Sequence, residues 1–258
     1  MNQNLSRRRF LAGLTGGAGV LALAGCDRLA QNVHFDTMLR NTEKLTMSSQ
    51  RLLLSRQQLA QEFGEADLSP VFRSNGTQMP DSDEYAQLLE GGFEDWRLQV
   101  NGLVERPQRL SLAELKRFPS RTQITRHDCV EGWSAIGKWQ GVPLGRILDS
   151  AGLKPGARFV VLHCADELEQ TLDGSGRYYE SIDLVDAYHP QTILAYGMNG
   201  VDLPVPHGAP LRLRVERQLG YKHAKYLMRI EVVDAFGALW GGKGGYWEDR
   251  GYEWYAGI

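Results

Sequence analysis

The residues best suited to chemistry lie in the segment RHDCVEGWS, residues 126–134. It places Cys129 beside Arg126 and His127, at the end of a stretch whose alternating pattern is typical of a β-strand. A neighbouring arginine or protonated histidine lowers the pKa of a thiol and favours the thiolate, which is a soft ligand for a transition metal. A second interpretation stays open, in which Cys129 is a small buried hydrophobic residue.

A second candidate is the pair His163 and Cys164, at the end of an expected buried strand. Together with His127 and Cys129 they could form a zinc-binding set, although their spacing fits no common zinc pattern. A disulfide between Cys129 and Cys164 is a further alternative, because an oxidising compartment would allow it.

The third candidate is a pair of cationic segments, HGAPLR at 207–212 and GYKHAK at 220–225. Arginine and lysine donate strong charge-assisted hydrogen bonds to phosphate groups, and glycine lets the backbone approach a ligand closely. The alternative is a solvated charged strand, on which Arg212 and Arg214 share one face because they lie two residues apart.

Short strands and helices must position these segments. A capping box at Ser111–Glu114 opens a short helix that stops before Pro119, and a second helix is expected over 142–151, before Gly152. Asn199-Gly200 is a strong hairpin signal. Alternating or apolar runs predict strands at residues 96–100, 122–129, 158–164, 211–215 and 227–233. The expected class is therefore mixed α+β with a strand-dominated body.

The regions that flank this body differ from it in pattern. Residues 29–62 predict one or two amphipathic helices, with leucines at 45, 52 and 59 spaced seven apart. Residues 64–82 are rich in Gly, Pro, Ser and Asp and predict a long loop. The tail, residues 237–258, combines tryptophans with glycines and predicts a coil laid over a surface.

The first 25 residues are interpreted as a targeting signal. Arg7-Arg8-Arg9 precedes an apolar run over 10–25 that is too short and too glycine-rich for a comfortable membrane span. The paired arginines fit the twin-arginine pattern. The following LAGC resembles a lipoprotein cleavage box with Cys26 as the lipidated residue, and Asp27 resembles a signal for retention in the inner membrane. An uncleaved anchor or a plain signal peptide is the alternative.

Composition excludes several classes of protein. The chain has 258 residues, 29 Lys+Arg against 31 Asp+Glu, and only 3 Cys. It is therefore neither a disulfide scaffold nor compositionally disordered. We expect no nucleic-acid partner, because such a protein would show a basic stripe.

Taken together, the segments RHDCVEGWS, HGAPLR and GYKHAKYL resemble the sulfite-oxidase-type molybdopterin oxidoreductases, in particular their bacterial, twin-arginine-exported branch that is related to the periplasmic methionine sulfoxide reductases. The likeness runs from about residue 72 to 233. It implies the sulfite-oxidase molybdopterin-binding fold, and four parts of the chain: a signal over 1–25, a helical extension over 26–63, the binding domain over 64–236 and the packed tail over 237–258.

The resemblance also implies a Mo-molybdopterin cofactor and roles for single residues. Cys129 matches the thiolate that binds molybdenum, and Arg126 and His127 match groups that orient its ligands. Cys164 matches a position that packs against the cofactor, and the tail aromatics are expected to cover the substrate mouth. The positions that match cofactor contacts elsewhere are Arg73, Asn75, His207, Arg212, His223, Ala224 and Lys225.

The activity that this resemblance implies is oxygen-atom transfer to or from a small substrate, such as an S-oxide, an N-oxide or a sulfite-like anion. The chain has no CxxCH haem motif and no iron–sulfur cysteine run. A membrane cytochrome b or another haem protein is therefore expected to exchange electrons with it. The arginine-rich stretch that follows the cysteine in animal sulfite oxidases is replaced here by VEGW at 130–133, which argues against sulfite.

The expected location is the periplasmic side of the inner membrane, reached by the twin-arginine pathway, with membrane contact only through lipid on Cys26. We expect a monomer, because the chain ends soon after its last predicted strand. Two other functions stay open: a non-catalytic lipoprotein on the same fold, and a zinc or thiol-redox protein that uses Cys129 and Cys164.

Overall fold

The computed structural model describes residues 33–172, 174 and 176–258. The chain divides into two compact units, residues 1–53 and 54–258. In the first unit, the helix α2 spans Val33–Leu53. No described helix is both long enough and apolar enough to cross a bilayer. The predicted export signal and the lipid site at Cys26 lie outside the described residues.

The helix α2 is shorter than the sequence predicts. It ends at Leu53, whereas the prediction extended helical structure to residue 62. Beyond it, the backbone N–H and C=O groups of Ala60 bond to the Gln191 side chain, and Glu62 forms a bridge with Thr125. These bonds satisfy the backbone in an extended conformation, so a helix has no advantage there.

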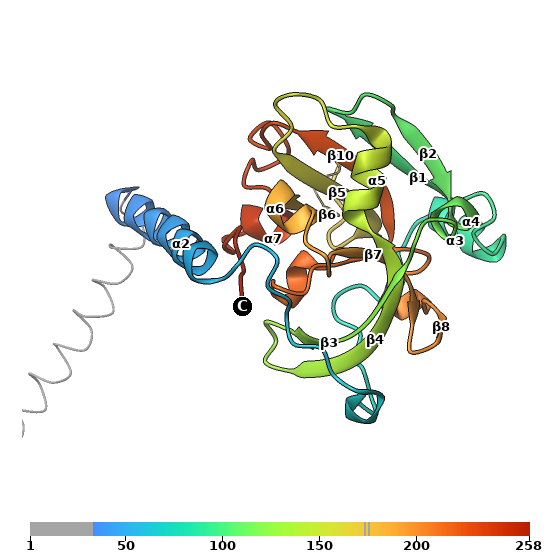
Figure 1. Ribbon diagram of the computed structural model, residues 1–258. Helices are drawn as coiled ribbons and strands as arrows, with labels where there is room; N and C mark the ends of the chain where they lie inside the picture. The colour runs from blue at the N-terminus through green and yellow to red at the C-terminus, as the bar shows by residue number, and fades with distance from the viewer. Residues whose placement is uncertain (1–32, 173, 175) are drawn as a thin grey trace, which may run out of the picture. The chain divides into compact units, whose positions relative to one another are not determined.

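The larger unit contains two sheets of five strands each among its described residues (Figure 1). In the first sheet β1 pairs in parallel with β10, and the other pairs are antiparallel. Its strand order is β2 (Gln108–Ser111), β1 (Arg97–Gly102), β10 (Leu227–Val233), β5 (Phe159–Glu167) and β6 (Arg177–Asp183).

The second sheet is antiparallel throughout and is built on the long β3–β4 hairpin. Asn199 and Gly200 both have positive φ, as the predicted two-residue turn between β7 and β8 requires. The strands are β3 (Arg121–Asp128), β4 (Ser134–Pro143), β7 (Ile193–Met198) and β8 (Val201–Asp202) in order. The strand β9 (Arg212–Arg214) also pairs with β7, over Ile193–Ala195.

Short helices connect and cover these sheets. The predicted capping box forms at Ser111, whose hydroxyl accepts from the N–H of Glu114 at 3.2 Å. Helix α5 leads from β4 to β5, from one sheet to the other (Figure 1). The helices are α3 (Asp83–Glu90), α4 (Leu112–Leu115), α5 (Leu144–Ala151), α6 (Leu184–Ala187) and α7 (Tyr246–Asp249), with 3₁₀ turns at Glu65–Asp67, Val205–His207 and Gly220–Lys222.

One continuous core joins both sheets and α5. It includes Leu98 of β1, Val160 of β5, Leu194 of β7 and Ile147 of α5, all fully buried. The expected α+β class with a strand-dominated body is confirmed. The tail differs from the predicted coil, because residues 246–249 form the turn of helix α7.

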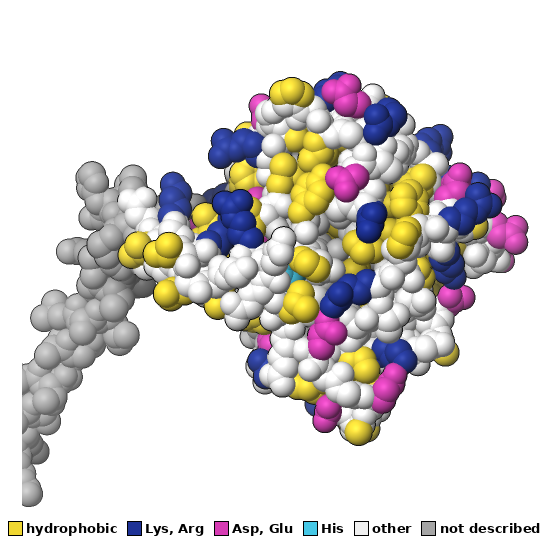
Figure 2. Space-filling view, in the orientation of Figure 1, with side chains coloured by type: hydrophobic (Ala, Val, Ile, Leu, Met, Phe, Trp, Pro, Cys, Tyr) yellow, Lys and Arg dark blue, Asp and Glu magenta, His cyan; other side chains and the backbone are white. Residues whose placement is uncertain are grey.

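Charges of both signs are scattered over the face of the larger unit seen in Figure 2, with apolar side chains between them. This pattern agrees with the near-neutral net charge of the sequence.

Candidate functional site

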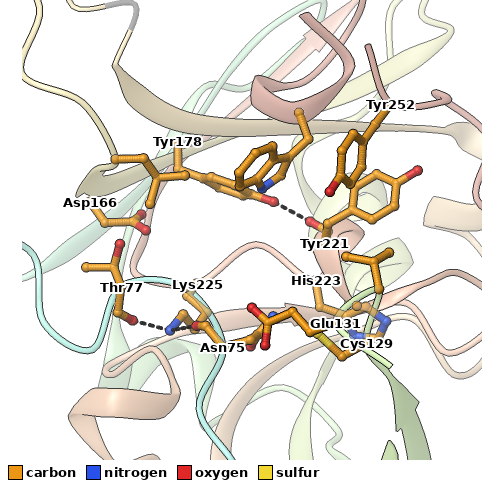
Figure 3. A pocket seen from close by; sticks show the side chains of 15 residues that line it. Asn75, Thr77, Cys129, Glu131, Asp166, Tyr178, Tyr221, His223, Lys225 and Tyr252 are labelled. Carbon is orange, nitrogen blue, oxygen red and sulfur yellow. Dashed lines mark hydrogen bonds between the residues drawn. The ribbon is translucent and has the colours of Figure 1, made fainter. Parts of the chain in front are cut away.

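A pocket of about 160 Å³ lies where both sheets, the loop over residues 64–82 and the tail come together (Figure 3). Cys129 and Glu131 line it from the β3–β4 turn, and Asp166 lines it from the end of β5. The remaining lining residues are Asn75, Gly76, Thr77, Val130, Leu168, Tyr178, Gly220, Tyr221, His223, Lys225, Trp247 and Tyr252. The pocket thus gathers residues that are up to 177 positions apart in the chain (75 to 252).

Cys129 follows the last residue of β3 and is held by a tight turn. Its N–H donates to the carbonyl of Trp133 and its own carbonyl accepts from Gly132, which has a φ of +85°. Burial and the nearby Glu131 carboxylate raise the pKa of the Cys129 thiol. The expected lowering of this pKa by Arg126 or His127 is therefore wrong, and the free thiol keeps its proton.

At the other end of the pocket, Lys225 holds the loop over residues 64–82 through hydrogen bonds. Its ammonium donates to the carbonyls of Asn75 (2.7 Å), Thr77 and Pro206 (3.1 Å), as Figure 3 shows for the first two. Burial and Arg212 lower the pKa of Lys225 to about 7, while Asp166 opposes this shift. Burial raises the pKa of Asp166 to about 6, against the effect of Lys225. The pocket thus has a thiol end and a lysine end.

Two histidine rings pack against each other beside the thiol end, and one of them, His223, lines the pocket. The Nε2 atom of His223 is 3.0 Å from the carbonyl of Gln218, and the rings of His127 and His223 are perpendicular, with centroids 5.0 Å apart. Burial and Arg214 hold the pKa of each histidine well below its usual value, so both are neutral. His127 Nε2, His223 Nδ1 and Asp166 Oδ1 are buried without a hydrogen-bond partner.

Arg212 and Arg214 are both fully buried, so the alternative of a solvated charged strand is wrong. Both guanidinium groups lie over the Trp139 ring, 5.1 and 4.4 Å from its centroid. Arg212 donates to the carbonyls of His207 (3.0 Å) and His223 (3.1 Å). It therefore fixes the backbone beside the pocket without lining it.

Several predicted site residues are not brought to the pocket. Arg126 is exposed, because side chains alternate between the two faces of β3 and Arg126 points away from the face that buries His127. Its guanidinium pairs with Asp128 on the same face, at 3.0 Å. Arg73 is also exposed. Neither His207 nor Ala224 lines the pocket. The carbonyl of His207 accepts a hydrogen bond from Arg212, and Ala224 stands between His223 and Lys225, which do line the pocket.

Cys164 lies inside β5, which continues to Glu167, and it lines a separate hollow with His163. Cys129 and Cys164 are both free thiols, so the disulfide alternative is not formed. Among the described residues, no three His, Cys, Asp or Glu side chains gather as a metal site. The zinc alternative, which needed His127, Cys129, His163 and Cys164 together, has no support from this geometry.

The sequence profile of the oxidoreductase molybdopterin binding domain matches residues 86–237. The chain belongs to this family. It is thus a sulfite-oxidase-type molybdopterin oxidoreductase, a molybdenum enzyme, as the resemblance of its motifs indicated.

Three known proteins illustrate what this chain is similar to. The chain is 36 % identical to a protein of Azospira oryzae named as protein-methionine-sulfoxide reductase subunit YedZ1, over 98 % of this chain and 88 % of that protein. It is 36 % identical to the protein-methionine-sulfoxide reductase catalytic subunit MsrP of Xanthomonas axonopodis pv. citri, over 63 % of this chain and 52 % of that protein. The chain therefore spans about half the length of that catalytic subunit. The sulfane dehydrogenase SoxCD from Paracoccus pantotrophus aligns with a TM-score of 0.48 and 27 % identity, over 55 % of this chain and 39 % of that one.

The pocket of this molybdopterin oxidoreductase fits the cofactor of its family. It offers a thiol as a soft metal ligand, a lysine for an anionic group, and a partnerless buried nitrogen on His223 that a polar ligand would satisfy. Residues Cys129, His223 and Lys225 would hold the group. Sequence reasoning missed Asp166 and Tyr178, because no local motif marks them. It did not name Tyr221, although that residue lies in the GYKHAK segment, and it expected the tail aromatics at the mouth without naming Trp247 or Tyr252.

Proposed function

We propose that this molybdopterin oxidoreductase reduces a sulfoxide to a sulfide. The observation that supports this most is the set of side chains around Cys129. Glu131 is next to it, and Val130, Trp247 and Tyr252 form an apolar and aromatic wall. Among the lining residues that the structure describes there is no arginine. Such a site suits a neutral sulfoxide better than a sulfite anion, which a nearby carboxylate repels.

The lysine end of the pocket does not change this argument. The Lys225 ammonium is held by three backbone carbonyls, and Asp166 lies near it. We assign this cation to an anionic group of the cofactor, which leaves the mouth beside Glu131 for the substrate. The neutral charge of a sulfoxide and its apolar substituents then match what the mouth offers.

The reaction is R₂SO + 2e⁻ + 2H⁺ → R₂S + H₂O. The bound cofactor supplies the oxygen-atom transfer and accepts the two electrons beforehand. The chain must supply the site for protons and must exclude bulk water. Asp166, with a pKa of about 6, is a buried carboxyl that can hold a proton near neutral pH at the pocket wall. The rings of Tyr178 and Trp247 shield the interior of the pocket.

We further propose, from the signal-like first 25 residues, that the protein is exported folded by the twin-arginine pathway and anchored through lipid on Cys26. A separate haem protein in the membrane would then deliver the electrons, because the sequence holds no haem or iron–sulfur motif of its own. The monomeric state stays a prediction.

An assay of both reaction directions tests the substrate class. Protein purified with its cofactor is given a reduced viologen dye and methionine sulfoxide, dimethyl sulfoxide or an N-oxide, and separately sulfite with an oxidising dye. We expect the sulfoxides to be turned over with the highest kcat/KM. Sulfite oxidation that exceeds sulfoxide reduction would contradict the proposal.

The matched variants are Glu131→Gln and Asp128→Asn, which remove one carboxylate inside the pocket and one outside it. We expect Glu131→Gln to improve the use of sulfite relative to the sulfoxide, and Asp128→Asn to leave that ratio unchanged. If the two variants behave alike, Glu131 does not select against anions.

A further inference from the structure

The pocket offers suitable groups for the cofactor of this family, but it is small. It encloses about 160 Å³, whereas pockets that take drug-sized ligands enclose about 300–1,000 Å³. Molybdopterin, a pyranopterin with a phosphate tail, is a ligand of that size. Part of the pocket wall must therefore move when the cofactor enters or leaves.

The lysine end of the pocket indicates which part of the wall moves. An ammonium group has three N–H donors, and Lys225 directs its bonds to three carbonyls. These carbonyls belong to Asn75, Thr77 and Pro206. An anionic group can therefore bind Lys225 only if at least one of these bonds weakens. Two of the three carbonyls belong to the segment 70–81, which makes this segment the part of the wall best placed to move.

The backbone of residues 70–81 is held by few bonds. Among the described residues, none over 70–81 forms a backbone–backbone hydrogen bond. The segment follows Ser69, whose N–H donates to the carbonyl of Ile136 at 3.1 Å, and it precedes Ser82, the N-cap of α3. Because no sheet or helix bond has to break, local opening of this segment costs less free energy than opening the strands beside it.

The Phe72 side chain anchors this segment by packing. Its ring lies in an aromatic socket formed by the rings of Trp139 (5.3 Å between centroids), His127 and His207 (both 5.7 Å) and Trp133 (6.3 Å). A Cβ atom at Gly137 would lie 3.0 Å from the Phe72 ring, so the glycine makes room for it. The neighbours of Phe72 in sequence, Val71 and Arg73, are exposed. Phe72 therefore fastens the segment to the sheet where backbone hydrogen bonds are missing.

We propose that residues 70–77 form a gate that opens to admit or release molybdopterin, and that Phe72 is the positioning residue that holds this gate shut. Residues 75–77 line the pocket, so movement of the gate would uncover the site (Figure 3). An anionic group competes with the gate for Lys225, whereas the apolar contact of Phe72 is unaffected by that competition. The inference concerns loading and retention of the cofactor, and it stands independently of whether the substrate is a sulfoxide.

Arg73 is exposed and provides a trypsin site inside the gate. We treat the wild-type holoenzyme with trypsin, follow cleavage after Arg73 by mass spectrometry of the fragments, and follow released pterin by its fluorescence. We expect protein that is cut after Arg73 to lose pterin faster than uncut protein. The matched variant Arg73→Gln lacks this site and should keep its pterin under the same treatment. Equal pterin retention by cut and uncut protein, or no cleavage after Arg73, would overturn the proposal.

The variant Phe72→Ala tests the anchor of the gate. We expect its holoenzyme to lose pterin about tenfold faster than the wild type during dialysis, which corresponds to about 1.4 kcal/mol. Cleavage after Arg73 should rise by a similar factor, because both rates follow the population of the open gate. Phe72→Leu keeps an apolar side chain in the socket and should restore part of the retention.

The control variant is Phe118→Ala, which removes a partly buried phenylalanine that packs against the main core. We expect it to leave both rates unchanged, even where it lowers the overall stability. Equal pterin loss from Phe72→Ala and Phe118→Ala would overturn the proposal, and so would faster pterin loss from Phe72→Ala without faster cleavage after Arg73. The comparison of cut and uncut wild type decides the question even if Phe72→Ala fails to fold.

Discussion

A buried cluster of one lysine and two glutamates joins the tail to β6 beside the pocket. Lys222 donates to Glu180 of β6 at 2.5 Å and to Glu248 of α7 at 2.6 Å. All three side chains are at most 1 % exposed. Burial and Glu248 raise the pKa of Glu180 well above its usual value, although Lys222 opposes them. The ammonium group of Lys222 therefore offsets the free-energy cost of burying two carboxyl groups.

The substitution Lys222→Met removes that ammonium group and leaves both carboxylates in place. Breaking a buried ion pair by removing one partner costs about 3–5 kcal/mol, because the other charge stays buried and uncompensated. Total stabilities are about 5–15 kcal/mol, so the variant would lose a large part of its stability. For a unit of this size the melting temperature would fall by about 6–20 °C.

The assay is urea unfolding followed by tryptophan fluorescence, with two comparison proteins. The triple variant Lys222→Met/Glu180→Gln/Glu248→Gln removes the stranded charges, and we expect it to recover most of the loss. Lys116→Met breaks an exposed pair with Asp202 and should cost at most about 1 kcal/mol. The reasoning is refuted if Lys222→Met costs no more than Lys116→Met, or if the triple variant is no more stable than the single one.

Three further predictions concern stability measured in the same way. Gly141→Ala should cost about 1–3 kcal/mol, because the new Cβ would lie 2.2 Å from the Leu194 carbonyl on β7, and a neutral effect would contradict the tight β4–β7 contact. Ser111→Ala should cost about 1 kcal/mol through loss of the cap of α4, and wild-type stability would show that the cap is unimportant. The raised pKa of Asp166 stabilises the fold below pH ~4 and this contribution is lost as the pH rises through about 6. Cofactor-free wild type should therefore lose stability between pH 4 and 7 relative to Asp166→Asn, by up to about 3 kcal/mol, and parallel pH curves would refute this.

The local parts of the fold were predictable, because their signals lie within a few residues. The capping box at Ser111, the Asn199-Gly200 turn and the strand that ends before Cys129 all form as their patterns indicate. The end of α2 was not predictable, since it depends on bonds from Ala60 to Gln191, which lies 131 residues away.

The site was predictable only where a motif marks it. Cys129, His223 and Lys225 reach the pocket, whereas Asp166 and Tyr178 lie in strands whose sequence gives no sign of a site. Burial of Arg214 also escapes a local analysis, because its partner Glu216 and the Trp139 ring make a charged strand suitable for the interior. The alternation of side chains along β3 predicts that Arg126 and His127 lie on opposite faces of the strand. It does not predict which of the two faces is buried.

The central claim is that Cys129 binds the molybdenum of the cofactor in this pocket. X-ray absorption at the molybdenum edge, together with pterin analysis, measures this on the wild type, Cys129→Ser and Cys164→Ser. We predict that Cys129→Ser keeps its pterin but loses one sulfur ligand of the metal, and that Cys164→Ser keeps the wild-type sulfur ligands. Unchanged sulfur coordination in Cys129→Ser, or loss of a sulfur ligand in Cys164→Ser, would contradict the account.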